Sequence, residues 1–366
     1  MKSILFITHN LTLGGVQKNI ALLANYFVQK CRVSILLFET KEVMYTLDKN
    51  IELFYLPQIY FSKKELSAEQ TGEKLFKFRV KGIKTFFKST LFDKIISFED
   101  YNNICTLTAL QENSNVIVSS RVSIGNMYKN QMIHLMPYSF YVSNIKKLYK
   151  NIKVISVSQG VAEELKEYNI ISKVIPNGID IDKIKELSLV ECDIKEPFLL
   201  HVGRFDTRQK GQKEALYAYS LIASKMKTKL VFIGDGKDKL HIQQEAERLK
   251  LEQRVIFKGY EQNPYCYMAN CEAFLFPSVY EGLPNTFLEA LSLNCKIISF
   301  KFIPSWREFA GYENVEFIDN DIEVLAQKIV DVLNQPNKKV KELNQRCINE
   351  FSLSQTFRKW ENIILN

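Results

Sequence analysis

Short apolar segments alternate with stretches of helical periodicity along the whole of this 366-residue chain. The strand-like segments are 3–8, 32–39, 51–57, 93–98, 115–121, 154–157, 198–203, 230–234, 254–260, 273–278 and 295–299. Buried strands that alternate with helices are typical of parallel sheets covered by helices on both faces. The sequence therefore predicts an α/β protein built on doubly wound parallel sheets.

A turn predicted at Pro176-Asn177-Gly178 divides this pattern into two halves. The chain is long enough for two domains, each with a core of its own. We therefore expect one domain over residues 1–178 and a second from residue 179. Two acidic triplets, 180–182 and 319–321, superficially offer a D-x-D metal motif. Neither is placed after a nucleotide-binding strand, so we expect no metal site there.

Composition narrows the class of protein. A hydrophobic share of 46% and a charged share of 25% are ordinary for a folded soluble chain, and no apolar run has membrane-spanning length. The seven cysteines form no C-x-x-C pair, which favours reduced core residues of a cytoplasmic protein over a disulfide frame or a zinc site. The net charge of +8 indicates an anionic partner: a phosphate-bearing substrate, an acidic membrane or nucleic acid. We find no nucleic-acid-binding motif.

The stretch 263–299 carries the clearest functional signal. Pro284 ends the preceding loop, and Asn285 or Thr286 is predicted to cap the helix that follows. Backbone N–H groups at such a helix start favour an anion. Glu281 lies before the helix and Glu289 about one turn into it, where their carboxylates could accept hydroxyl hydrogens. The alternative is an amphipathic helix with two solvated glutamates.

Other candidate residues follow strands. Arg204 and Lys210, after 198–203, could neutralise a diphosphate as charge develops on it. Gly14 and Gly15 follow the first strand and let the backbone approach a ligand, although the dinucleotide fingerprint G-x-G-x-x-G is missing. Arg121, at the end of 115–121, could meet an acceptor diphosphate or form a structural ion pair.

Two further features admit two interpretations each. His134 is a candidate acceptor-binding residue, but a lone histidine is also commonly packed or solvated. Residues 74–91 predict an amphipathic helix with lysines on one face and phenylalanines on the other. This helix suits an anionic bilayer surface, or it is a surface helix whose phenylalanine face packs on the first sheet.

Three strings together resemble the retaining glycosyltransferases of family 4, which have the GT-B fold. They are P-N-G-I-D at 176–180, G-R-(x)5-K-G at 203–211 and S-x-x-E-G-L-P-N-x-x-L-E-A-L-x-x-x-x-K-I-I at 278–298. The resemblance implies two Rossmann-like domains that face a cleft, with the C-terminal helix (351–366) crossing back to the first. It implies acceptor binding by 1–178 and nucleotide-sugar binding by 179–350.

The resemblance also implies residue roles. Glu281, Arg204 and Lys210 would be catalytic, Arg121 and His134 would bind acceptor, and neither metal nor cofactor would be required. The implied donor-binding residues are Gly14, Gly15, Gly203, Arg204, Lys210, Gly234, Phe257, Lys258, Gly259, Glu281, Gly282, Leu283, Asn285, Thr286, Phe287 and Glu289. The chain departs from the family pattern at Gln17, where an acid is common, at Ser305 and Asn294, where glycine is common, and at Lys296, where proline is usual.

The expected function is retaining transfer of a hexose or N-acetylhexosamine from a nucleotide sugar, with UDP favoured by its frequency in the family. The expected acceptor is a lipid-linked glycan of bacterial surface polysaccharide, capsule or lipopolysaccharide assembly. The protein is expected to lie in the cytoplasm, peripheral on the inner membrane face through residues 74–91. Two alternatives stay open, a non-catalytic GT-B scaffold and a GT-B nucleotide-sugar epimerase.

Overall fold

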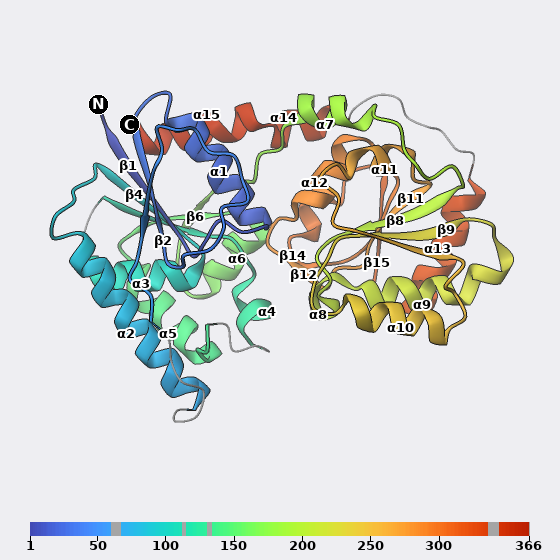
Figure 1. The fold of residues 1–366 in the computed structure, drawn as a ribbon, viewed down its shortest axis with the longest axis horizontal. Helices are drawn as coiled ribbons and strands as arrows, with labels where there is room; N and C mark the ends of the chain where they lie inside the picture. Colours follow the sequence, from blue (N-terminus) through green and yellow to red (C-terminus); the bar gives the residue numbers. More distant parts are fainter. Residues whose placement is uncertain (60–66, 112–114, 130–133, 336–343, 366) are drawn as a thin grey trace. The chain divides into compact units, whose positions relative to one another are not determined.

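A computed structural model of the chain describes residues 1–59, 67–111, 115–129, 134–335 and 344–365. These residues form two compact units. Unit 1 comprises Met1–Asn177 and Thr356–Asn366, and unit 2 comprises Gly178–Gln355. Each unit is built on its own parallel sheet with helices (Figure 1). The predicted α/β fold class is therefore confirmed.

The sheet of unit 1 has seven strands in the order β3-β2-β1-β4-β5-β6-β7. The strands are β1 Ser3–Thr8, β2 Arg32–Leu37, β3 Glu52–Tyr55, β4 Lys94–Phe98, β5 Val116–Ser120, β6 Lys153–Ser156 and β7 Ser172–Val174. All their pairings are parallel. The strand order reverses between β1 and β4, which makes the carboxyl ends of these two strands the topological switch point of the sheet.

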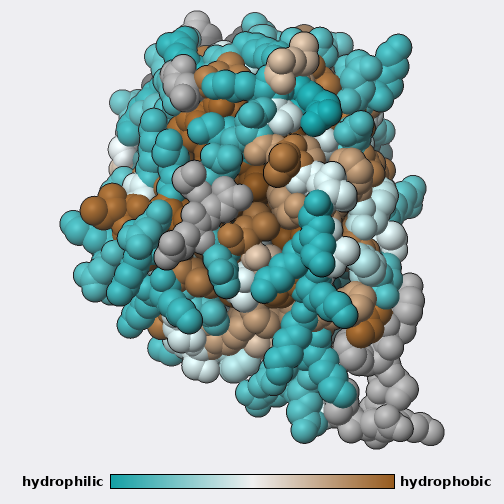
Figure 2. Space-filling view, turned by 90° about the vertical axis from the view of Figure 1, so that its left-hand side faces the viewer, coloured by the Kyte–Doolittle hydropathy of each residue, from teal (hydrophilic) through white to brown (hydrophobic). Residues whose placement is uncertain are grey.

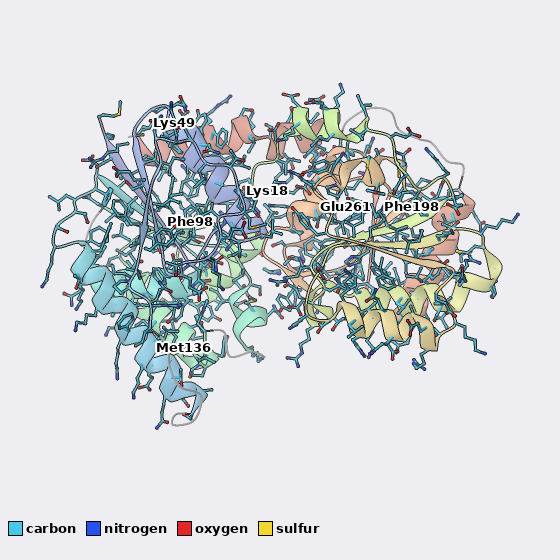
Figure 3. The ribbon with its side chains drawn as sticks, in the orientation of Figure 1. Lys18, Lys49, Phe98, Met136, Phe198 and Glu261 are labelled. Atoms are coloured by element: carbon cyan, nitrogen blue, oxygen red, sulfur yellow. The ribbon has the colours of Figure 1, made fainter. Side chains whose placement is uncertain are left out.

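The helices of unit 1 include the C-terminal one. They are α1 Gly15–Phe27, α2 Ala68–Phe86, α3 Asp100–Leu110, α4 Ile124–Lys129, α5 Tyr138–Leu148, α6 Gln159–Glu167 and most of α15 Leu353–Ile364. Trp360 of α15 is 1% exposed, and its ring lies 5.9 Å from that of Phe98, which is labelled in Figure 3. The ring of Phe357 stacks on that of Tyr26 at 4.0 Å. The C-terminal helix thus returns to the first unit, as predicted.

Unit 2 contains a six-stranded parallel sheet in the order β10-β9-β8-β11-β13-β15 and a separate pair, β12-β14. The strands are β8 Phe198–Val202, β9 Lys229–Ile233, β10 Val255–Gly259, β11 Ala273–Phe276, β12 Tyr280–Glu281, β13 Ile297–Phe300, β14 Ile303–Pro304 and β15 Val315–Ile318. Phe198 marks the start of β8 in Figure 3.

Helices cover the sheet of unit 2. They are α7 Ile181–Ser188, α8 Thr207–Lys210, α9 Gln212–Ile222, α10 Lys239–Arg248, α11 Tyr265–Asn270, α12 Asn285–Ser292, α13 Ile322–Asn334 and α14 Gln345–Phe351, with 3-10 turns at Ala223–Lys225 and Trp306–Phe309. Residues from strands and helices, such as Leu199, Phe232, Leu275, Leu216 and Ile329, form one buried core. This core fixes the loops at the strand ends.

The helix predicted at 74–91 begins earlier and ends sooner than expected. Ser67 and Gln70 form a capping box that starts α2 at Ala68, and the helix ends at Phe86. Two phenylalanines of α2 pack inside unit 1: Phe76 lies 5.1 Å from Phe140 and Phe86 lies 5.1 Å from Phe54 between ring centroids.

The predicted lysines are all exposed: Lys74, Lys77, Lys81 and Lys84 on α2, and Lys88 beyond its end. Figure 2 shows the face of unit 1 on the side where α2 lies, with hydrophilic side chains prominent. Among the described residues, no helix is both long and apolar enough to cross a membrane.

Candidate functional site

A buried ion pair lies at the centre of the predicted donor site in unit 2. Lys210 ends the single turn of α8, and its Nζ lies 2.5 Å from Oε1 of Glu281 in β12. The side-chain amide of Gln209 also donates to Oε2 of Glu281 and to the carbonyl oxygen of Tyr280, each at 3.3 Å. The structure therefore brings together two of the three predicted catalytic residues, which are far apart in sequence.

Glu281 is held by the short β12-β14 pair. Glu281 lies opposite Pro304 in the parallel β12-β14 pair, and Glu281 is 6% exposed. The hydroxyl of Ser305 is fully buried and donates to the carbonyl oxygen of Gly282 at 2.5 Å. Serine in place of the glycine common in the resembled family thus anchors the loop that carries Glu281.

The backbone around Lys210 is placed by a close approach at Gly211. This residue has φ +70°, and a Cβ built there would lie 2.0 Å from the carbonyl oxygen of Pro277. The next contact along the loop is a hydrogen bond of 2.9 Å from Val279 N–H to the carbonyl oxygen of Gln209. Only glycine lets the α8–α9 corner lie against the end of β11.

His201 in β8 supports the same loop, and sequence reasoning missed it. Its Nε2 lies 2.9 Å from the carbonyl oxygen of Lys210, and the residue is 2% exposed. Burial lowers the pKa of His201 to about 4, so the imidazole is neutral at pH 7 and Nε2–H donates to that carbonyl. A histidine inside an apolar strand was the only sequence signal for this role.

The other predicted cation of the loop after β8, Arg204, is more exposed to solvent than Lys210. Arg204 has 62% of its side chain exposed and lies 3.7 Å from Asp206 on the same loop. Its carbonyl oxygen accepts from the amide of Gln212 at 2.8 Å. Gly234 has φ +137°, and a Cβ there would lie 2.1 Å from the carbonyl oxygen of Gly203. The loops after β8 and β9 are therefore in direct backbone contact.

Helix α12 begins at the predicted position, but its N-cap residue is not the predicted one. The N-cap residue is Pro284, whose side chain makes no capping hydrogen bond, so the prediction that Asn285 or Thr286 caps the helix was wrong. The reason is that Asn285 already has helical geometry. The first-turn N–H groups of α12 lie at the positive end of the helix dipole, where an anion is favoured.

The side chains of α12 divide between core and site. Phe287 is fully buried, with its ring 4.7 Å from that of Phe309, so it can offer a ligand only its backbone. Glu289 is 4% exposed, and the hydroxyl of Tyr265 donates to its Oε1 at 3.3 Å. Leu283 is likewise buried. Asn294, two residues beyond the end of the helix, has φ +56°, a left-handed conformation that glycine and asparagine both adopt after helices.

The donor-binding residues predicted at 257–259 lie in β10. Phe257 stacks on Phe232 with centroids 5.4 Å apart, and Gly259 accepts from Gly234 N–H at 2.7 Å. Nζ of Lys258 donates to the carboxylate of Asp193 at 2.6 Å, and this hydrogen bond raises the pKa of Lys258. The lysine side chain is thus engaged within unit 2, which leaves the backbone of the segment for a ligand.

The predicted residues of unit 1 lie at the carboxyl edge of its sheet. The hydroxyl of Tyr45 lies 2.8 Å from both the N–H and the carbonyl oxygen of Gly14, and Gly15 begins α1. Arg121 is 5% exposed and donates to Asn177 and, at 3.4 Å, to Ser119.

Burial lowers the pKa of Arg121 to about 9. His134 lies between two other rings, 4.4 Å from that of His9 and 4.3 Å from that of Tyr101. Burial is also the main reason that the pKa of His134 lies well below its ordinary value. Of the two predicted acceptor-binding residues, Arg121 is therefore buried in unit 1 and His134 is half-buried, and both pKa values are lowered.

Residues 190–350, which hold Lys210, Glu281 and Glu289, match the family model of glycosyl transferases group 1. They belong to this family. Over 319 residues the chain is 26% identical to N-acetylgalactosamine-N,N'-diacetylbacillosaminyl-diphospho-undecaprenol 4-alpha-N-acetylgalactosaminyltransferase of Campylobacter jejuni, covering 85% of this chain and 84% of that protein.

A second relative from Campylobacter jejuni is 24% identical over an alignment that spans 100% of this chain and 98% of that protein. It is the GalNAc-alpha-(1->4)-GalNAc-alpha-(1->3)-diNAcBac-PP-undecaprenol alpha-1,4-N-acetyl-D-galactosaminyltransferase.

Solved structures of glycosyltransferases confirm the GT-B fold. Sucrose-phosphate synthase from Thermosynechococcus elongatus superposes with a TM-score of 0.80 at 16% identity, over 99% of this chain and 98% of that one. Anabaena HepE, solved in complex with UDP and glucose, gives a TM-score of 0.76 at 17% identity over 100% of both chains.

Proposed function

We propose that this glycosyltransferase transfers a sugar, with retention of configuration, from a UDP-sugar to a lipid-linked glycan. The single observation that carries the donor assignment is the Lys210–Glu281 pair, buried at 2.5 Å in the segment that matches the family. A largely buried ammonium group near the start of a helix is suited to a diphosphate leaving group. UDP is proposed from the family resemblance.

Each part of the nucleotide sugar can be assigned to described side chains or backbone groups of unit 2. Lys210 and the exposed Arg204 would stabilise charge on the diphosphate, while the first-turn N–H groups of α12 would hold its oxygens. Glu289, which is buried, would accept the ribose hydroxyls, and Glu281 would contact the sugar near the reacting carbon. These roles require neither a metal nor a cofactor.

Retention is proposed to proceed by attack on the same face of the sugar. The acceptor oxygen bonds to the anomeric carbon as the bond from that carbon to the diphosphate oxygen breaks. The departing phosphate takes the acceptor's proton, so no protein base is needed. Glu281 is already paired with Lys210, which supports a binding role for this carboxylate rather than that of a covalent nucleophile.

The acceptor is proposed to be a glycan linked to a polyprenyl diphosphate. The two Campylobacter jejuni relatives carry such acceptors in their names and transfer N-acetylgalactosamine, which favours an N-acetylhexosamine as the sugar. The exposed lysines of α2 would hold the protein on an anionic membrane surface. Because Phe76 and Phe86 pack inside unit 1, this contact would be electrostatic.

A thermal-shift panel tests the donor assignment. UDP, GDP, ADP and their common sugars are added with and without EDTA, and we expect stabilisation by UDP compounds that EDTA does not remove. The Lys210→Ala variant should lose this stabilisation, and Glu281→Gln and Arg204→Ala should lose turnover while remaining folded. If no nucleotide stabilised the folded wild-type protein, the scaffold alternative would replace the transferase.

A further inference from the structure

A buried arginine lies on the otherwise apolar face of α2 and has no role in the function proposed above. Arg79 is 6% exposed, and its guanidinium group lies 5.4 Å from the ring centroid of Phe38 and 5.2 Å from that of Tyr101. Burying a guanidinium group costs free energy unless partners compensate it. A buried guanidinium group therefore needs partners, and a bound ligand can be one of them.

The partner of Arg79 is a carboxylate at the end of β2. Nη2 of Arg79 lies 3.5 Å from Oε1 of Glu39, to which His9 also approaches at 2.9 Å. Lys41 lies 2.7 Å from the other oxygen, Oε2. The hydrogen bond from His9 is the main reason that the pKa of Glu39 is held well below its ordinary value.

The cluster lies where this fold class places ligands. His9 and Glu99 directly follow β1 and β4, and Glu39 comes two residues after the end of β2, so all three lie at the carboxyl edge, next to the switch point. The cluster also reaches solvent, because 13% of the His9 side chain and 25% of the Glu39 side chain are exposed.

Two observations indicate that the cluster is incomplete without a ligand. Nη1 of Arg79 is buried and makes no hydrogen bond with the residues that the structure describes. The backbone is also strained beside it, since Glu99, His134 and Leu135 have φ of +71°, +51° and +62°. Non-glycine residues with such angles cluster at ligand-binding sites.

The charges of the cluster select the kind of ligand. Arg79 and Lys41 share the single carboxylate of Glu39. The other carboxylate at this edge, Glu99, accepts hydrogen bonds from Thr8 at 3.3 Å and from Asn102 at 3.1 Å. Positive charge is therefore in excess, and a phosphate group would satisfy it.

We propose that Arg79 and Lys41, oriented by Glu39 and His9, form a subsite for a phosphate group of the acceptor. Arg79 would donate from Nη1, and Lys41 from its exposed ammonium group. This inference rests on the proposed function, because it assigns residues of unit 1 to the diphosphate of a lipid-linked acceptor. It replaces Arg121, whose side chain is enclosed by Asn177 and Ser119.

Inorganic pyrophosphate is the probe that tests this subsite. It is titrated calorimetrically into the Lys210→Ala variant of the full chain, whose donor site is expected to have lost its affinity for a diphosphate. We expect Arg79→Gln to weaken pyrophosphate binding about 10–100-fold, as expected for loss of a hydrogen bond to a charged group. Arg79→Lys should recover part of the affinity because it keeps the charge but not the fork.

Two further variants separate the subsite from general electrostatics and from misfolding. Lys49→Gln removes the same charge from an exposed position at the opposite edge of the sheet, ahead of β3, and should change binding less than twofold. Lys41→Gln alters a side chain that is 54% exposed, so it should fold normally and weaken binding about threefold or more.

Equal binding by Arg79→Gln and its parent, or the absence of pyrophosphate binding by the parent, would overturn the subsite. If Arg79→Gln failed to fold, Lys41→Gln alone would decide, with unchanged affinity as the negative result. Failure of the proposed function would be seen in a different experiment, the thermal-shift panel, in which no nucleotide would then stabilise the wild-type protein. The pyrophosphate titration does not depend on that result.

Discussion

Replacing Lys210 by methionine would remove one partner of the buried pair and keep most of the side-chain volume. Glu281 would then be a buried carboxylate whose described side-chain partner is the Gln209 amide at 3.3 Å. We expect Lys210→Met to destabilise unit 2 and to abolish its stabilisation by UDP.

Breaking a buried ion pair by removing one partner costs about 3–5 kcal/mol of unfolding free energy. The Lys210 side chain is 18% exposed and that of Glu281 7%, so the pair is largely dry and the lower end applies. Unit 2 spans Gly178–Gln355. For a unit of this size, about 3 kcal/mol corresponds to a midpoint lowered by about 6–12 °C.

Thermal unfolding followed by circular dichroism measures this change, with Glu281→Gln and the double variant completing a double-mutant cycle. We expect a coupling energy of about 2 kcal/mol between the two positions. The matched control is Lys229→Met, whose ammonium group pairs at 2.7 Å with Glu196, a side chain that is 55% exposed. Loss of this surface pair should cost at most about 1 kcal/mol.

If the unfolding midpoint of Lys210→Met fell no further than that of Lys229→Met, the Lys210–Glu281 pair would stabilise unit 2 no more than a surface ion pair does. A coupling energy of zero would be equally damaging, since it would mean that the 2.5 Å contact contributes nothing to folding.

Three further outcomes are expected. Changing Lys77, Lys81 and Lys84 to glutamate should release the protein from anionic liposomes in a flotation assay, and unchanged binding would leave α2 as a packed surface helix. Gly211→Ala should lower the midpoint in circular dichroism and weaken UDP binding, because its Cβ would lie 2.0 Å from a backbone oxygen; wild-type behaviour would contradict this. Burial lowers the pKa of His201 from 6.5 to about 4, so unfolding takes up a proton in that range. Denaturant titrations should show stability falling by about 2 kcal/mol between pH 6.5 and 5, and less in His201→Asn.

The fold could be predicted from the sequence because its signals are local. Each buried strand is a short apolar run, and the turn at Asn177-Gly178 lies at the division between the units. The limits of α2 were less accessible. Its start is set by the reciprocal hydrogen bonds of Ser67 and Gln70, a signal that the stripe of lysines obscured.

The candidate site was predictable where its residues fall within one string. Glu281 and Glu289 belong to such a string, but the contact of Glu281 with Lys210 joins two loops that only the folded sheet brings together. Arg79 falls on the phenylalanine face of the helix predicted at 74–91, and helical periodicity gives the direction of its side chain but not the carboxylate that it meets. Glu39 and His9 each follow a strand, and their contact depends on the pairing of β1 with β2.

The return of α15 to unit 1 has a consequence for how the protein is made. Trp360 completes the core around Phe98, yet the whole of Gly178–Gln355 is synthesised first. At about 5–20 residues per second, a ribosome needs roughly 10–40 s to make the intervening segment. Throughout that interval the nascent first unit lacks its tryptophan, while the second unit emerges as one continuous segment. Translation therefore favours closure of the second core before the first.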